Sequence, residues 1–274
     1  MTFVKRRPIS FFLAAAIVIT YVGGIAVFLL VQEIQQHSGI DLRWAGEFVL
    51  KFGPTLAAIL TMSLSTGSRG IRDLVRRCAQ WRSSFRLYAA AILLQPAILA
   101  IVLIIQGHGQ QLQSITFEAA IAAFAVQLAL SVFLGGGLGE EPGWRGFMLP
   151  RLLERHGPLA ASLLVTVAWF AWHVPAFILF DKGASDPILP FAVILLPFSI
   201  ILTYLCLRSN QGLVLPILLH GSVNASYYTM EALLPEVTGA PDFQPAFDWW
   251  LAGIWCVLGA IVAWRPVSTT GVDR

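Results

Sequence analysis

Charged residues are scarce in this sequence. Asp, Glu, Lys and Arg make up 12% of its 274 residues, whereas soluble domains carry about 25%. Hydrophobic residues make up 57%, and the mean hydropathy is +0.74. A fold in water would therefore leave a large apolar surface exposed. The composition excludes an ordinary soluble protein and indicates that the chain folds in lipid.

Cysteine is also rare, and its placement excludes a disulfide framework. Cys78, Cys206 and Cys256 are an odd number of thiols without the spacing of metal ligands. Two of them fall in apolar runs, where a cysteine is usually a small buried hydrophobe. The sequence further lacks internal repeats, low-complexity tracts and a polar stretch long enough for a soluble domain. We expect a single membrane domain over residues 1–274.

Long apolar runs are what the sequence does contain. Each is long enough to cross a bilayer, which takes about 20 residues, and the expected spans are Ile9–Leu30, Phe48–Ser65, Leu87–Ile105, Phe117–Leu134, Pro158–Phe180, Pro187–Leu207, Leu213–Leu233 and Trp249–Trp264. The first run is too long for a signal peptide, and no cleavage site follows it. The sequence predicts an all-α polytopic protein with about eight transmembrane helices that enclose a polar site.

The basic residues predict the orientation of these helices. With the N-terminus in the cytoplasm, only Arg43, Lys51 and Lys182 of the 18 Lys and Arg residues lie outside. The other fifteen lie inside: Lys5, Arg6, Arg7, Arg69, Arg72, Arg76, Arg77, Arg82, Arg86, Arg145, Arg151, Arg155, Arg208, Arg265 and Arg274. Cytoplasmic loops carry such an excess. We expect a multi-pass protein of a prokaryotic cell membrane with both termini cytoplasmic, and no nucleic-acid partner despite the pI near 8.9.

One basic loop has two interpretations. Arg69–Arg86 reads RGIRDLVRRCAQWRSSFR, which predicts an amphipathic helix lying on anionic lipid. The alternative is a solvated basic loop that only sets the topology. The sequence leaves both open.

Ionisable residues within the apolar spans are few and fall into three clusters. They lie in Gly135–Arg151, Trp169–Pro175 and His220–Asn224. Such residues are costly in a membrane, so each is a candidate for function.

The first cluster contains two adjacent carboxylates with different expected roles. On a helix, Arg145 lies one turn after Glu141 and within reach of an ion pair, whereas Glu140 points about 100° away. Glu141 would then be held ionised, and Glu140 could take a proton from water. Four glycines between 135 and 139 predict a helix break before Glu140. The alternative is an ordinary carboxylate pair at a helix start.

The other two clusters supply histidines. His173 lies in an apolar span among aromatic residues, and His220 and Asn224 are four residues apart and share one helix face. Either cluster alone could be interhelical packing with hydrogen bonds. Together with Glu140, a histidine can deprotonate water, and a histidine with an asparagine can stabilise an oxyanion. No serine or cysteine with a base partner competes for this role.

The ordered motifs resemble those of a known family. Glu140-Glu141-x3-Arg145, Trp169-x3-His173 and His220-x3-Asn224 are similar to the motifs of the CAAX-processing and bacteriocin-processing (CPBP, or Abi) family of intramembrane endopeptidases. The resemblance is strong over about residues 117–228, the expected peptidase core. One departure is visible, because the family commonly has Phe where this chain has Trp169.

The resemblance implies a site that opens toward the cytoplasm. It implies that Glu140 and His173 activate water, that His220 and Asn224 form the oxyanion hole, and that Glu141 and Arg145 support the site. The family has long been described as metal-dependent, and a carboxylate with two histidines could hold zinc. The sequence contains no compact ligand pair such as H-E-x-x-H, so we favour metal-free chemistry without a cofactor.

The expected partners are the bilayer and a membrane-associated substrate. In a prokaryote this would be a membrane peptide or protein, or a bacteriocin-type precursor, since prenylated C-terminal peptides are substrates of eukaryotic relatives. Two other classes remain. One is a non-catalytic peptide-binding or immunity scaffold, and the other is a small proton-coupled transporter, which the lack of inverted repeats disfavours.

Overall fold

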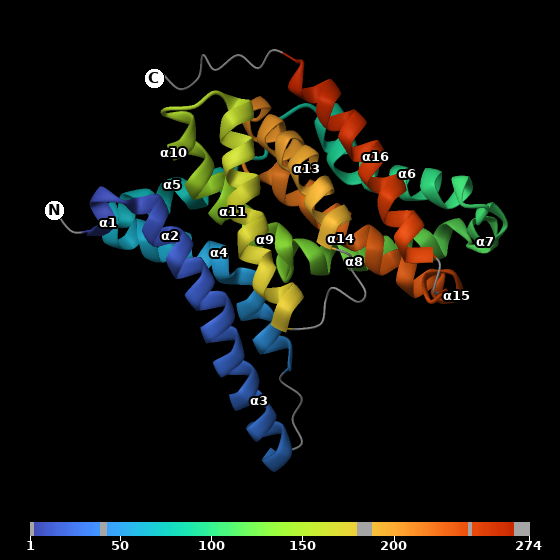
Figure 1. Ribbon diagram of the computed structural model, residues 1–274, viewed down its shortest axis with the longest axis horizontal. Coiled ribbons are helices and arrows are strands. Elements are labelled where there is room, and N and C mark those ends of the chain that lie inside the picture. The colour runs from blue at the N-terminus through green and yellow to red at the C-terminus, as the bar shows by residue number, and fades with distance from the viewer. Residues whose placement is uncertain (1–2, 39–42, 180–187, 241–242, 266–274) are drawn as a thin grey trace.

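The fold consists of helices throughout the part of the chain that the computed structural model describes, residues 3–38, 43–179, 188–240 and 243–265. Figure 1 shows their arrangement. The elements are α1 (Phe3–Arg6), α2 (Pro8–Ile17), η1 (Val18–Gly23), α3 (Gly24–Ser38), α4 (Arg43–Ser65), α5 (Ser68–Cys78), α6 (Phe85–Ile105), α7 (Gly109–Ser114), α8 (Phe117–Phe133), α9 (Gly136–Glu141), η2 (Pro142–Met148), α10 (Leu149–Leu153), α11 (Pro158–Leu179), α13 (Ile188–Arg208), α14 (Val214–Leu233), α15 (Pro235–Thr238) and α16 (Phe243–Ala263).

Seven helices among the described residues are long and apolar enough to cross a membrane. They include the helix Pro8–His37 and the segment Phe117–Leu153, which contains α8, α9, η2 and α10. The prediction of an all-α polytopic membrane protein is confirmed. The seventh expected span, Leu213–Leu233, forms a 20-residue helix, α14, but its polar side chains leave it outside this set.

Two expected elements differ in their bounds. The first helix does not end near Leu30 but continues to Ser38 through the π-helical turn η1. The predicted amphipathic helix Arg69–Arg86 is wrong in its second half, because α5 ends at Cys78. Ala79 caps α5, and a new helix, α6, begins at Phe85 after the Ser84 cap. Parts of the topology assignment lie outside the described residues, namely Phe180, Lys182, Pro187 and Arg274.

The short helix α9 lies at the centre of the molecule, between α4 and α14 (Figure 1). Glycines allow this close packing. A Cβ on Gly139 would lie 2.4 Å from the carbonyl oxygen of Lys51 in α4, and one on Gly137 would lie 3.0 Å from that of Ile217 in α14. Both distances are too short for a side chain, so the two glycines let the neighbouring backbones approach α9 directly.

A buried arginine fixes α5 to the centre of the fold. The guanidinium of Arg77 donates to the carbonyl oxygens of Gln211 (2.7 Å), Gly146 (2.7 Å) and Arg145 (3.0 Å). The amphipathic helix is therefore joined to η2, which follows the two adjacent glutamates. Next to Arg77, burial raises the pKa of the Cys78 thiol to about 11. This thiol is protonated at neutral pH, as expected of a structural cysteine rather than a nucleophile.

Candidate active site

The glutamate pair lies at a break in the fourth apolar run. Helix α8 ends at Phe133, and α9 begins at Gly136 and carries Glu140 and Glu141 in its last turn. The helix break predicted before Glu140 is confirmed. Pro142 then opens the π-helical segment η2. Such segments are often found at functional sites, because they change the direction in which neighbouring side chains point.

Glu141 binds two cationic or polar partners. Its Oε1 accepts a hydrogen bond from Nη1 of Arg145 (3.2 Å) and another from Nδ1 of His220 (2.7 Å). All three side chains are buried. The expected ion pair between Glu141 and Arg145 is confirmed. The hydrogen bond of His220 to the same oxygen was not predicted from the sequence. Since a carboxylate only accepts, Nδ1 of His220 carries a proton.

Arg145 has three kinds of neighbour. Besides Glu141, its Nη2 donates to the hydroxyl oxygen of Ser199 in α13 (2.9 Å). Its guanidinium also lies over the indole ring of Trp169, 4.4 Å from the ring centroid. A buried charge is tolerated when it is both paired and hydrogen-bonded. These contacts join α9–η2 to α11 and α13.

Glu140 has different surroundings from Glu141. Its Oε2 accepts a hydrogen bond of 2.6 Å from the indole Nε1 of Trp169. Its Oε1 and Nε2 of His220 both lie close to the backbone of Gly136. A Cβ on Gly136 would lie 3.0 Å from Oε1 of Glu140 and 2.5 Å from Nε2 of His220. A side chain at this position would collide with both groups, so the glycine makes room for a carboxylate oxygen and an imidazole nitrogen beside the same backbone.

His173 is joined to this cluster through the backbone. Its Nδ1 donates to the carbonyl oxygen of Trp169 (2.9 Å), and its ring contacts the rings of Trp169, Trp172 and Phe191. The side chain is half-buried. Because the carbonyl only accepts, a neutral His173 has its lone pair on Nε2.

Asn224 follows His220 by one turn of α14 and is half-buried. Within the described residues, no hydrogen bond or ion pair joins Asn224 to the other predicted site residues. The structure thus joins Glu141 to both Arg145 and His220 by hydrogen bonds. It places Glu140 and His220 beside the same glycine, Gly136. It places His173 beside them, and Asn224 on the adjacent turn.

A zinc site would need several ligands close together. The described residues contain no group of three His, Cys, Asp or Glu side chains that could hold a metal ion. Nδ1 of each site histidine is engaged by a protein oxygen, which leaves Nε2 as the second nitrogen of each ring. We derive no step through a metal.

Two contributors were missed by the sequence analysis. The indole N–H of Trp169 was not recognised as a donor to Glu140, although the change from the family's usual Phe was the visible signal. The partner of Arg145, Ser199, is a lone hydroxyl in an apolar span, and nothing in the sequence distinguishes it from a packing serine. Its hydroxyl also donates to the carbonyl oxygen of Ser162 (3.3 Å).

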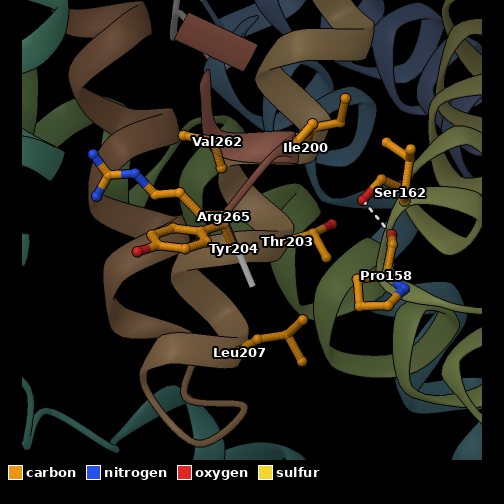
Figure 2. A pocket seen from close by; sticks show the side chains of 10 residues that line it. Pro158, Ser162, Ile200, Thr203, Tyr204, Leu207, Val262 and Arg265 are labelled. Carbon is orange, nitrogen blue, oxygen red and sulfur yellow. Dashed lines mark hydrogen bonds between the residues drawn. The ribbon is translucent and has the colours of Figure 1, made fainter. Parts of the chain in front are cut away.

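A cavity of about 200 Å³ lies away from these residues, between α11, α13 and the end of α16. Figure 2 shows the side chains that line it, including Ser162, Thr203, Tyr204 and Arg265. None of the predicted site residues is among them. Ser162, which lines the cavity, accepts a hydrogen bond at its carbonyl oxygen from Ser199, the partner of Arg145.

Comparison with known proteins agrees with the motifs. Residues 121–226 match the family described as type II CAAX prenyl endopeptidase Rce1-like. A curated relative, "CAAX prenyl protease 2" of Methanococcus maripaludis, is 22% identical over 182 residues, which cover 62% of this chain and 67% of the relative. The resemblance to intramembrane CAAX-type endopeptidases is thereby confirmed, and both matches support a hydrolase of peptide bonds.

Proposed function

Because residues 121–226 match the family described as type II CAAX prenyl endopeptidase Rce1-like, we propose that this protein cleaves membrane-associated peptides or proteins with a water molecule activated by Glu140. Its substrates are peptides that reach the site from the cytoplasmic side of a prokaryotic cell membrane. The reaction needs no cofactor.

The observation that carries this proposal is the placement of Oε1 of Glu140 and Nε2 of His220 beside Gly136. A water molecule bound by both groups would lie next to a base and next to a polar group that can bind the substrate. Such an arrangement meets the geometric requirement for general-base catalysis, which is a hydrogen bond between the base and the attacking water.

The reaction follows from these positions. Glu140 takes a proton from the water, and the resulting hydroxide adds to the carbonyl carbon of the scissile bond. His173 assists by accepting a hydrogen bond from the water at Nε2. The carbon–nitrogen bond then breaks, and the proton held by Glu140 passes to the leaving nitrogen. This returns Glu140 to the carboxylate form.

His220 and Asn224 stabilise the oxyanion that forms on the attacked carbonyl. Because Nδ1 of His220 donates to Glu141, Nε2 can donate only when the ring is an imidazolium. Glu141 balances that charge, which is why it contacts His220 as well as Arg145. The amide of Asn224 is a neutral donor on the same helix face, and a neutral donor pairs well with an oxyanion.

Peptide cleavage by the purified protein in detergent tests the proposal. We would compare a farnesylated peptide with a C-terminal CAAX sequence, chosen after the relative's name, and an unprenylated peptide with a membrane anchor. Wild-type protein should cleave at least one of them, and Glu140→Gln should not. Cleavage that persists in Glu140→Gln would contradict the assignment of the base. No cleavage of either peptide by the wild type would favour a non-catalytic scaffold.

A further inference from the structure

Trp169 contacts four residues of the proposed machinery, namely Glu140, Arg145, His173 and His220. Its indole N–H donates to Oε2 of Glu140, its ring face lies under the guanidinium of Arg145, and its carbonyl oxygen accepts from Nδ1 of His173. Its ring centroid lies 5.4 Å from that of His220. The residue is buried, so these contacts are shielded from water.

These contacts divide the two oxygens of Glu140 between two tasks. The Trp169 hydrogen bond of 2.6 Å occupies Oε2. The other oxygen, Oε1, lies beside Gly136 on the same side as Nε2 of His220. A carboxylate without the indole bond could rotate about its last side-chain torsion and exchange the two oxygens, because that torsion is broad and nearly two-fold.

The position of Arg145 limits how Trp169 itself can move. Its guanidinium stacks on the indole face at 4.4 Å while its Nη1 is bound to Glu141. Rotation of the indole away from Glu140 would break this cation–π contact, which is strong in a desolvated site. The aromatic ring is therefore held from one side by Arg145 and bonded at its edge to Glu140.

We propose that Trp169 is a positioning residue that fixes Oε2 of Glu140 through its indole N–H and thereby makes Oε1 the atom that takes the proton from water. The inference rests on the proposed hydrolysis. It also assigns a role to the difference from the family's usual Phe at this position, since a phenylalanine ring has no N–H to donate.

The chain contains a matched control for this role. Trp172 lies one turn from Trp169 on α11, is also buried, and donates its indole N–H to the hydroxyl of Thr20 (3.0 Å). It contacts His173 but makes no hydrogen bond to Glu140. Trp169→Phe and Trp172→Phe thus each remove one buried indole hydrogen bond from the same helix and leave a similar void.

Steady-state kinetics of the two variants give the first test. Thermal stability and gel filtration show whether each variant is as well folded as the wild type. We expect Trp169→Phe to lower kcat about tenfold to a hundredfold, the size of a hydrogen bond to a charged group, with KM changed less than about threefold. Trp172→Phe should keep kcat within about threefold of wild type. Equal kcat for Trp169→Phe and wild type would overturn the proposal, and so would an equal loss in both variants.

A second measurement does not depend on turnover. In a ¹H–¹⁵N spectrum of tryptophan-labelled protein, the indole signal that disappears in Trp169→Phe identifies Trp169. This signal should shift in Glu140→Gln, while the Trp172 signal should not. An unchanged Trp169 signal would show that the bond to Glu140 does not exist. If the wild type cleaves no peptide, the proposed function fails together with the catalytic role of Trp169, and the spectrum still decides whether the bond is present.

Discussion

Glu140 and Glu141 are neighbours in the chain but have opposite environments. Glu141 is held by Arg145 and His220, whereas Glu140 accepts from the neutral indole of Trp169 and has its other oxygen near Nε2 of His220 at Gly136. One carboxylate is therefore a structural anion, and the other is available as a base. This division at the level of single residues leads to different expectations for the same substitution at the two positions.

Glu140→Gln should abolish hydrolysis and leave the fold intact, because the amide has nearly the same shape but cannot take a proton. Glu141→Gln should lower both activity and stability, because it leaves Arg145 buried without its ion pair, a loss of about 3–5 kcal/mol when one partner of a buried pair is removed. Turnover and the thermal midpoint in detergent measure the two effects. Equal destabilisation in both variants would contradict the division of roles.

Gly136 should be intolerant of even one methyl group. In Gly136→Ala the new Cβ would lie between Glu140 and His220, and we expect kcat to fall by a factor of ten or more, on the order of 1.4 kcal/mol. Gly253→Ala is the matched control, because nothing lies within 4 Å of a Cβ at that position of α16. Full activity of Gly136→Ala would show that the reacting water does not bind between Glu140 and His220 beside this glycine.

His220 and Asn224 separate oxyanion stabilisation from zinc binding. If both donate to an oxyanion, His220→Ala and Asn224→Ala should each lower kcat by about 10²–10³-fold, within about tenfold of one another. A neutral amide is a poor zinc ligand, so Asn224→Ala would matter little in a zinc site.

Elemental analysis and chelation complete this comparison. We expect active protein without stoichiometric zinc and with activity that survives a chelator. One zinc per chain, lost together with activity on chelation and restored on addition, would disprove the metal-free mechanism but not the peptidase. His220→Ala should also reduce the thermal midpoint more than Asn224→Ala, because only His220 is bonded to Glu141.

At the scale of elements, α5 and η2 behave as one unit. Three carbonyl oxygens, two of them in η2, depend on Arg77 for a hydrogen bond. Since π-helical geometry shifts the backbone hydrogen-bond pattern, an arginine from another helix supplies donors where the segment's own N–H groups do not. The amphipathic helix α5 therefore supports the backbone that follows Glu140 and Glu141.

Arg77→Met should destabilise the protein by about 3 kcal/mol or more, since each buried acceptor left unpaired costs about 1–3 kcal/mol. That corresponds to roughly 6–12 °C in the thermal midpoint. Arg76→Gln is the control, because Arg76 is exposed and, among the described residues, pairs with its neighbour Asp73 on the same helix. Such exposed pairs contribute little to the free energy of unfolding. Equal midpoints for the two variants would show that Arg77 does not support η2.

At the scale of the whole molecule, basic residues gather at one end of the helix bundle. Figure 1 shows α10, the start of α11 and the end of α16 at its upper end, and α10 and α11 pack together there. Arg151, Arg155 and Arg265 belong to this region. The positive-inside rule predicts that this region is cytoplasmic.

Single cysteines test that orientation. In a protein without its native cysteines, Gly157→Cys between α10 and α11 should be protected from an impermeant maleimide added to intact cells. Ser114→Cys at the end of α7 should react, because one span separates the two loops. Both positions are exposed. The opposite labelling pattern would invert the topology and move the site to the outer face.

The sequence by itself determined the membrane class, most spans and the contact of Glu141 with Arg145. These depend on local quantities, namely hydropathy over about 20 residues and the four-residue spacing of one helical turn. The break before Glu140 was predictable for the same reason, because glycines act on their own backbone.

Only the tertiary structure decided which side chains share the site. Trp169 and Glu140 are 29 residues apart in the chain, and His220 and Glu141 are 79 apart. No local pattern fixes such pairs. Their distances depend on how closely α4, α11 and α14 pack around α9, and that packing is set by glycines whose contacts lie on other helices. For the same reason the early end of α5 was missed, since the chain there turns to place Gln80 against the carbonyl of Ser209.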